Sequence, residues 1–339
     1  MKKFYISSTD QNDTAGNYSE DFYRLVLRNM EYEFINRDEE VSNILSLVAS
    51  MDHVHLEIGP GRTKEWELLK IMLDANYKSV AITLHNVEFF KEAMSTGKNG
   101  RRRPLAKFYY HFIGQYQIAE QYLRKIKWIY VLTFIQQSRL RHSFRLDNVH
   151  YLPRIINPLC VSRQEENGRN IFCQTALLDK GSLDYLLILH KNLLNAHPQI
   201  RLLIAITEPV STRTLTGILD KYNRNVQCIL LPDKNALEGM LKECAISVIV
   251  ETASGLSGIN QLLWYYQRGK VVFFSKKDYS SALSGSTPAY YLSGNIQRDV
   301  SVFTSLLSDP VAITTERKKM SGYLTEYHSF HSISQRLNV

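Results

Sequence analysis

HVHLEIG (53–59), RTKEWELLKIMLDAN (62–76) and KSVAITLH (78–85) follow one another in the first third of the chain and decide its fold. The first and third segments are short and apolar, as buried strands are, whereas the middle segment carries apolar residues at helical spacing. The same alternation begins earlier with KKFYIS and YEFIN and continues to WIYVLTF (128–134). Strands that alternate with helices at this interval pair in parallel through right-handed crossovers. The sequence therefore predicts a doubly wound α/β sheet.

A second series of alternating segments follows a break in the pattern. Residues 154–169 are rich in proline, glycine and polar side chains and are interpreted as an interdomain linker. NIFCQTA, IRLLIAIT, VQCILLP, ISVIVETA and VVFFS then read as strands separated by helices. We expect two domains, residues 1–153 and 170–315, and a C-terminal helix at 316–339 that crosses back to the first domain. Ligands of open parallel sheets bind beyond the carboxyl ends of the strands, so the site is expected between the two sheets.

The composition is that of a globular protein with excess positive charge. Of 339 residues, 44% are hydrophobic and 22% are charged, and no apolar run approaches the roughly 18 residues that span a bilayer. The N-terminus lacks the apolar stretch of a signal peptide and the four cysteines show no paired spacing, so we expect a cytoplasmic protein without a thiolate metal site. A net charge of +8 favours an anionic partner.

A short glycine motif at the end of the expected strand at 53–59 indicates, when taken by itself, a single class of enzymes. Leu56-Glu57-Ile58-Gly59-Pro60-Gly61 resembles the first motif of S-adenosylmethionine-dependent methyltransferases, in which a strand runs into a glycine loop beside the cofactor. That family has a further glycine where Arg62 or Thr63 stands, and an acidic residue at the end of the next strand, which here ends in His85. A methyltransferase therefore remains the second hypothesis, and a plain strand-to-helix turn is the structural alternative.

Two longer segments carry a broader resemblance. NIFCQTALLDKGSLDYLLILHKNLLNAHPQIRLLIAI (170–206) has a strand, a loop ending in Lys180-Gly181, a helix and a second strand. LPDKNALEGMLKECAISVIVETASGLSGINQLLWYYQRGKVVFFS (231–275) continues with a helix, a strand, a glycine-containing loop and another helix. Together they resemble the GT-B glycosyltransferases, specifically the nucleotide-sugar-dependent family 4 of bacterial surface polysaccharide assembly. The resemblance covers nearly the whole chain and implies two Rossmann-like domains facing a central cleft.

The resemblance also implies a set of site residues. The lysine that binds the donor diphosphate in that family corresponds to Lys180, and the strand-end histidine that reaches the donor sugar corresponds to His85, so these two are the implied catalytic residues. Small residues at a helix start let phosphate approach backbone N–H groups. No cofactor and no metal is implied, because cations and backbone dipoles stabilise the departing diphosphate. The implied donor-binding residues are Gly16, Asn17, Lys180, Gly181, Glu251, Ser254, Gly255, Ser257, Gly258 and Asn260.

Two departures from the family pattern keep a further alternative open. Where the family has a pair of glutamates, this chain has Leu256 and Trp264, so both carboxylates are missing. The family also has an arginine shortly before the lysine, and no arginine stands in Thr175–Leu178. These departures favour, as the non-enzymatic alternative, a catalytically inactive GT-B binding module. Trp264, Tyr265 and Tyr266 read more simply as helix packing than as a nucleobase platform.

The excess charge is concentrated in RRRPLAKFYYHFIGQYQIAEQYLRKIKW (101–128), where cations alternate with aromatic residues. This composition suits an anionic membrane surface, where a lipid-linked acceptor would be presented. No nucleic-acid-binding motif accompanies it, and a solvated helix face is the structural alternative. We therefore expect a peripheral protein at the inner membrane face that binds a nucleotide-sugar and a glycan or lipid-linked acceptor, and no nucleic acid. The expected membrane-surface residues are Arg101, Arg102, Arg103, Lys107, Arg124, Lys125, Lys127 and Trp128.

Overall fold

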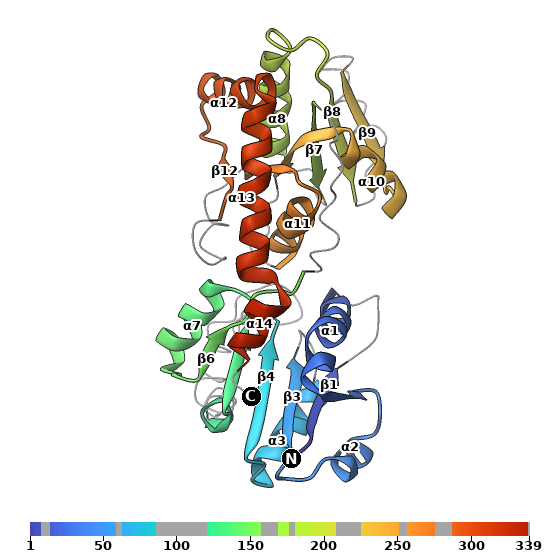
Figure 1. The fold of residues 1–339 in the computed structure, drawn as a ribbon, viewed down its shortest axis with the longest axis vertical. Coiled ribbons are helices and arrows are strands. Elements are labelled where there is room, and N and C mark those ends of the chain that lie inside the picture. The colour runs from blue at the N-terminus through green and yellow to red at the C-terminus, as the bar shows by residue number, and fades with distance from the viewer. Residues whose placement is uncertain are drawn as a thin grey trace, which may run out of the picture. The chain divides into compact units, whose positions relative to one another are not determined.

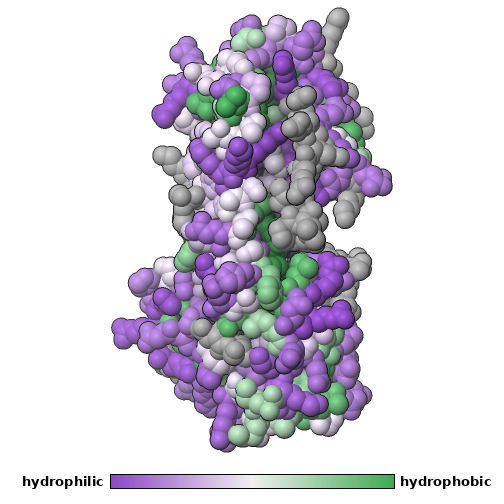
Figure 2. All heavy atoms as spheres, viewed as in Figure 1, coloured by the Kyte–Doolittle hydropathy of each residue, from purple (hydrophilic) through white to green (hydrophobic). Residues whose placement is uncertain are grey.

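The computed structural model forms two compact units. The first consists of residues 1–156 and 328–339, and the second of residues 157–327. Within these units the structure describes residues 1–7, 14–58, 63–85, 121–156, 169–175, 180–207, 225–250, 256–274 and 287–337. Most of the visible face of each unit is hydrophilic (Figure 2), because the apolar side chains gather around the two sheets.

The first unit contains a six-stranded sheet in the order β2-β1-β3-β4-β5-β6, in which every neighbouring pair is parallel (Figure 1). The order reverses direction between β1 and β3, as in a doubly wound fold. Its strands are β1 (Lys3–Ser7), β2 (Tyr32–Asn36), β3 (His53–Ile58), β4 (Ser79–Leu84), β5 (Trp128–Val131) and β6 (Val149–Tyr151). Its helices include α1 (Thr14–Leu25), the 3-10 helix η1 (Leu27–Met30), α2 (Val41–Leu47), α3 (Thr63–Asp74) and α7 (Phe134–Phe144).

The two faces of this sheet differ in chemistry. Because successive side chains of a strand point to opposite faces, one face carries the aliphatic residues of β3 and β4, which pack with α2, α3 and α7. The opposite face, here termed the polar face, is buried as well but is built from hydroxyl, imidazole, carboxyl and aromatic groups. Helix α1 covers part of it through Phe22, whose ring meets Tyr5 and His55 edge-on. The polar face comprises Tyr5, Ser7, His53, His55, Glu57, Ser79, Thr83, His85 and Tyr130.

The second unit contains another all-parallel six-stranded sheet, in the order β12-β11-β10-β7-β8-β9. Its order reverses direction between β7 and β10. Phe273 on β11 packs its ring on Phe303 of α12, which joins the sheet core to the helices that follow it. The strands are β7 (Asn170–Thr175), β8 (Leu202–Ile206), β9 (Val226–Leu230), β10 (Cys244–Ile249), β11 (Val271–Phe274) and β12 (Tyr290–Tyr291). The helices include α8 (Lys180–Leu193), α10 (Lys234–Lys242), α11 (Leu256–Gln267) and α12 (Ile296–Ser308).

Two helices end the chain, α13 (Pro310–His328) and α14 (Phe330–Arg336). The end of α13 and all of α14 belong to the first unit. His328 is buried there, and its Nδ1 donates a hydrogen bond to the carbonyl oxygen of Arg154 at 2.6 Å. The backbone carbonyl oxygen of His328 accepts a hydrogen bond from the amide of Ile156 at 3.0 Å. The segment that follows β6 is thereby fixed to the last helices.

The predicted doubly wound α/β architecture with two parallel sheets is confirmed. The short strands β6 and β12 were not expected, because two or three residues show no periodicity. The polar run of residues 8–17 predicts a loop before a helix that starts at Tyr18, and this boundary is wrong, since α1 already begins at Thr14. The sequence also predicts a helix over Leu105–Lys125. Most of that range lies outside the described residues, which show a helix at 121–125.

Three further findings concern the described residues alone. No helix among them is long and apolar enough to cross a bilayer. They contain no group of three or more His, Cys, Asp or Glu side chains placed to hold a metal ion. Among the cysteines that the structure describes, Cys228 and Cys244 are free thiols, and Cys173 and Cys244 are buried.

Candidate functional site

His85 lies directly after β4, at the carboxyl end of the first sheet, and its backbone is fixed on both sides. Its amide donates to the carbonyl oxygen of Ile58 at 3.0 Å, which extends the β3–β4 ladder by one residue. Its carbonyl oxygen accepts a hydrogen bond from Nε2 of Gln136 at 3.1 Å. Gln136 is itself held near the start of α7, because its amide donates to the N-cap hydroxyl of Thr133 at 3.1 Å. The position of His85 is therefore set by two strands and a helix.

The imidazole of His85 is bound to a buried carboxylate. Nε2 of His85 bonds to Oε2 of Glu57, whose side chain is 0% exposed. The other carboxylate oxygen, Oε1, accepts the hydroxyl of Tyr5 at 2.9 Å. A buried carboxylate is tolerated only when its oxygens are hydrogen-bonded, and here each has a partner. Since Glu57 engages Nε2, Nδ1 is the ring nitrogen left for a ligand.

Tyr18 and Arg154 extend this cluster. Tyr18 of α1 meets the His85 ring edge-on, with 5.1 Å between ring centroids, and the guanidinium of Arg154 lies 5.8 Å from the centre of the Tyr18 ring. Burial, with a smaller contribution from the nearby negative charge of Glu57, raises the pKa of Tyr18 well above its ordinary value, so its hydroxyl stays protonated. Within the described part of the chain, Arg154 has no ion-pair partner within 4 Å. The carboxyl end of the first sheet thus combines an oriented imidazole with a half-buried cation.

These groups lie where the strand order reverses. Tyr5 comes from β1 and Glu57 from β3, the neighbouring strands from which the sheet is wound in opposite directions. In open α/β sheets, connections leave the two strands at such a point toward opposite faces, and ligands bind in the crevice outside their carboxyl ends. The cluster around His85 therefore occupies the part of this sheet where a ligand is expected.

The second sheet has its own reversal point, between β7 and β10. Lys180 is the first residue of α8, which follows β7, and Gly181 comes next to it. Helix α11 follows β10 and begins at Leu256, so the backbone of Ser257, Gly258 and Asn260 lies in its first turns and not in the preceding loop. Two helix N-termini thus start beyond adjacent parallel strands, an arrangement that suits an anionic ligand.

Other predicted donor residues can be followed only in part. Gly16 and Asn17 lie in the first turn of α1 and not in a loop. The helical spacing of apolar residues begins only at Tyr18, so the sequence does not reveal the first turn of this helix. Glu251, Ser254 and Gly255 lie outside the described residues. The donor-binding roles of the whole set stay predictions.

The aromatic residues of α11 pack as the simpler interpretation expected. Tyr265 and Tyr266 are fully buried, and Tyr265 accepts a hydrogen bond from Gln261 Nε2 at 2.7 Å. The same Nε2 reaches the carbonyl oxygen of Gln174 on β7 at 3.1 Å. Trp264 stacks under the guanidinium of Arg268, at 4.4 Å from the ring centre. Gln261 joins α11 to the sheet through its contact with Gln174, and Tyr265 does so through its ring, which meets Phe172 of β7 edge-on.

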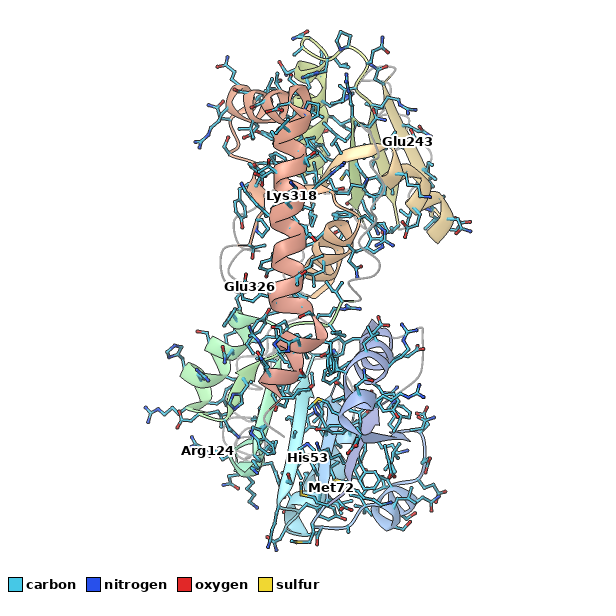
Figure 3. The ribbon with its side chains drawn as sticks, in the orientation of Figure 1. His53, Met72, Arg124, Glu243, Lys318 and Glu326 are labelled. Carbon is cyan, nitrogen blue, oxygen red and sulfur yellow. The ribbon has the colours of Figure 1, made fainter. Side chains whose placement is uncertain are left out.

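Of the expected membrane-surface residues, the structure describes the last four; Arg101, Arg102, Arg103 and Lys107 lie outside the described residues. Arg124, labelled in Figure 3, donates to the carbonyl oxygen of Phe144 at 3.1 Å and so contributes to the fold of the first unit. Lys127 lies over the ring of half-buried Trp128 at 4.0 Å, and Lys125 over that of Tyr122 at 5.2 Å. Lys127 and Trp128 are at the amino-terminal end of β5, away from the strand ends that carry His85.

Sequence reasoning did not include Tyr5, Tyr18, Glu57 or Arg154 among the site residues. In the sequence, Glu57 stands out only as part of a glycine motif, and Arg154 only as part of a linker. A usable signal was present: His53, His55 and Glu57 alternate along an otherwise apolar strand, which places three polar side chains on one buried face. Such a run predicts partners on the neighbouring strands, although it does not say which residues they are.

Two all-parallel, doubly wound units in tandem define an α/β protein of the GT-B fold. The structure of HepE from Anabaena in complex with UDP and glucose is similar at a TM-score of 0.61 and 10% identity, over 99% of this chain and 98% of that one. TarM is similar at a TM-score of 0.58 and 15% identity, over 87% of this chain and 56% of TarM. A trehalose-6-phosphate structure from E. coli bound with UDP-2-fluoro glucose is similar at 0.55 and 11% identity, over 87% of this chain and 74% of that one.

This chain thus spans little more than half the length of TarM. No protein-family model and no curated protein sequence matches it. At 10–15% identity, the structural likeness shows a shared fold.

Proposed function

We propose that this protein is a glycosyltransferase that moves a sugar from a nucleotide-diphosphate sugar to a glycan or lipid-linked acceptor in the assembly of a bacterial surface polysaccharide. The observation that carries the proposal is the pair of helix N-termini, α8 with Lys180 and α11, at the reversal point of the second sheet. Transfer from such a donor requires that the charge of the departing diphosphate be stabilised, for which a lysine and free backbone N–H groups are suited.

The solved structures of the same fold support this donor class. HepE has been seen with UDP-glucose, and S. aureus TarM with UDP and alpha-GlcNAc-glycerol. In the proposed division of roles, the second unit binds the nucleotide-sugar, whereas the first unit supplies His85 and contacts the acceptor. The assignment to surface polysaccharides rests on the sequence resemblance.

Ligand-induced stabilisation tests the proposal against its alternatives. UDP or GDP should raise the melting temperature, because a ligand that binds only the folded state stabilises it by about 2.7 kcal/mol at a hundred times its Kd. Nucleotide sugars should then be turned over with release of the nucleotide. Stabilisation by S-adenosylmethionine alone would favour the methyltransferase, and nucleotide binding without turnover of any nucleotide sugar would favour the inactive binding module.

Lys180→Ala should weaken UDP or GDP binding while the protein stays folded. A charge-assisted contact contributes roughly 1.5–3 kcal/mol, which corresponds to about a ten- to more than a hundredfold loss of affinity. Isothermal titration of the wild type and the variant measures it. Lys191→Ala is the matched control, because Lys191 is an exposed lysine in the last turn of the same helix. Equal affinities of wild type and Lys180→Ala would remove Lys180 from the donor site.

The basic and aromatic segment 101–128 is proposed to bind an anionic membrane surface. Each cation near such a surface contributes about 1 kcal/mol, so changing Arg101, Arg102 and Arg103 together to Ser should release the protein from anionic liposomes at low salt. Donor affinity should not change. The control removes the same charge from the second unit at three exposed cations, Lys242, Arg298 and Lys318. The proposal would be contradicted if both triple variants bound anionic liposomes equally well, or if the wild type did not bind them.

A further inference from the structure

The contacts of Glu57 have a consequence for His85 that the proposed function does not include. Glu57 is fully buried on the polar face near the carboxyl end of β3, and both of its carboxylate oxygens are engaged, one by Tyr5 and one by Nε2 of His85. A carboxylate accepts hydrogen bonds and cannot donate them, so the nitrogen that meets it must carry a proton. In neutral His85 the proton is therefore on Nε2, and Nδ1 carries the lone pair.

The surrounding groups hold this arrangement in place. The hydroxyl of Tyr5 fixes Oε1 of Glu57 at 2.9 Å, and Gln136 and Ile58 fix the backbone of His85. The Tyr18 ring lies edge-on to the imidazole and limits its rotation. An imidazole held through its backbone, its Nε2 atom and its ring face has one well-defined orientation.

We infer that Glu57 is a positioning residue, which fixes His85 in the Nε2–H tautomer and offers Nδ1 to a hydroxyl group of the sugar substrate. The inference concerns the same site as the proposed function and rests on it for the identity of the substrate. An Nδ1 lone pair accepts a hydrogen bond from a hydroxyl, whereas the other tautomer would present an N–H there. Glu57 itself does not touch the substrate; it acts through His85.

The first experiment measures the tautomer directly and needs no enzyme activity. In protein labelled with 15N-histidine, the His85 signals, assigned by their loss in His85→Ala, should show a protonated Nε2 and an unprotonated Nδ1 at a pH where the ring is neutral. Glu57→Leu removes both acceptor oxygens and should give a mixture of tautomers. A wild-type ring protonated on Nδ1, or a tautomer unchanged in a folded Glu57→Leu variant, would overturn the inference.

The second experiment uses kinetics to separate positioning from a structural role. If Glu57 acts through His85, Glu57→Leu should lower kcat by at least about 10²-fold with little change in donor KM. In a protein that already carries His85→Ala, adding Glu57→Leu should lower kcat no further. Glu57→Gln keeps an acceptor oxygen for Nε2–H and should retain kcat within about tenfold of the wild type. If the loss of kcat in the double variant equals the product of the losses in Glu57→Leu and His85→Ala, the positioning role is overturned.

Asp299 provides the matched control. It is a buried carboxylate in the second unit that accepts a hydrogen bond from Tyr185 and from the hydroxyl of Ser293 at 2.7 Å, so its removal also disturbs a buried polar group. Asp299→Asn should change stability but not the His85 signals. If no nucleotide sugar is turned over while the Nε2–H tautomer depends on Glu57, then the proposed function fails and the positioning of the imidazole stands.

Discussion

His85→Ala should lower kcat by about 10²–10³-fold while changing the affinity for the nucleotide by less than about threefold. A side chain that exchanges a proton or a hydrogen bond with the reacting group contributes about 10²–10⁴-fold to the rate, whereas the proposed nucleotide contacts belong to the second unit. Initial rates at saturating donor and direct titration with UDP or GDP separate the two quantities. Equal turnover by the wild type and the folded variant would leave His85 as a structural histidine.

A second variant, His85→Gln, separates a loss of turnover from a loss of folding. Removing the imidazole leaves the Glu57 carboxylate buried with only Tyr5 as a partner among the contacts described above, and an uncompensated buried charge destabilises a protein by about 3–5 kcal/mol. His85→Gln retains an amide N–H that can meet Glu57, so it should preserve the fold and still lose turnover. If His85→Gln is folded and fully active, the imidazole has no part in the reaction.

Acidification from pH 7 to pH 5 should remove about 6 kcal/mol of folding free energy from the first unit. Burial is the main reason why the pKa of His53 falls to about 4, that of His55 to about 3 and that of His328 to about 4, and nearby cations contribute at His53 and His328. The unfolded chain has ordinary histidines with a pKa of about 6.5 and binds protons below that pH, whereas the folded chain does not. Their contribution to stability is therefore fully present above pH 6.5 and is lost as the pH falls toward the folded pKa values, by about 2 kcal/mol for each histidine at pH 5.

The surroundings of two of these rings explain why they stay neutral. Nδ1 of His53 shares a hydrogen bond with Ser79 at 2.8 Å, and Nε2 of His55 shares one with Thr83 at 2.7 Å. The second nitrogen of each of these rings is buried without a hydrogen-bond partner in the described part of the chain, so a proton added there would have no acceptor. His53 (Figure 3) also lies near cations that disfavour a further positive charge, those of Lys3 and Lys127.

Chemical denaturation between pH 7 and pH 5 measures this loss. His55→Phe should flatten the dependence of the unfolding free energy on pH by up to about 1.4 kcal/mol per pH unit, because one proton fewer is taken up on unfolding. His142→Gln, at an exposed histidine of α7, should leave the slope unchanged. A loss of about 6 kcal/mol is comparable to the whole stability of many domains, so an unfolding free energy that is flat over this range would show that the histidines are not buried as described.

The alternation of strands and helices was readable from sequence because it depends on local periodicity. Residues 53–85 show the apolar runs of β3 and β4 and the helical spacing of α3, and the structure has these elements within a few residues of the expected positions. The position of His85 at a strand end followed from the same pattern. The strands β6 and β12 and the start of α1 were missed, since each is too short or too polar at that point to display a period.

The sequence by itself determined which segments are strands and helices, that the strands form two parallel sheets, and that His85 follows a strand. Only the tertiary structure decided which side chains meet. Tyr5 and Glu57 are 52 residues apart in the chain, and Glu57 and His85 are 28 apart, yet they form one hydrogen-bonded group. Periodicity reports whether a position is buried, whereas contact across a sheet depends on strand order and register, which arise from packing of the whole unit.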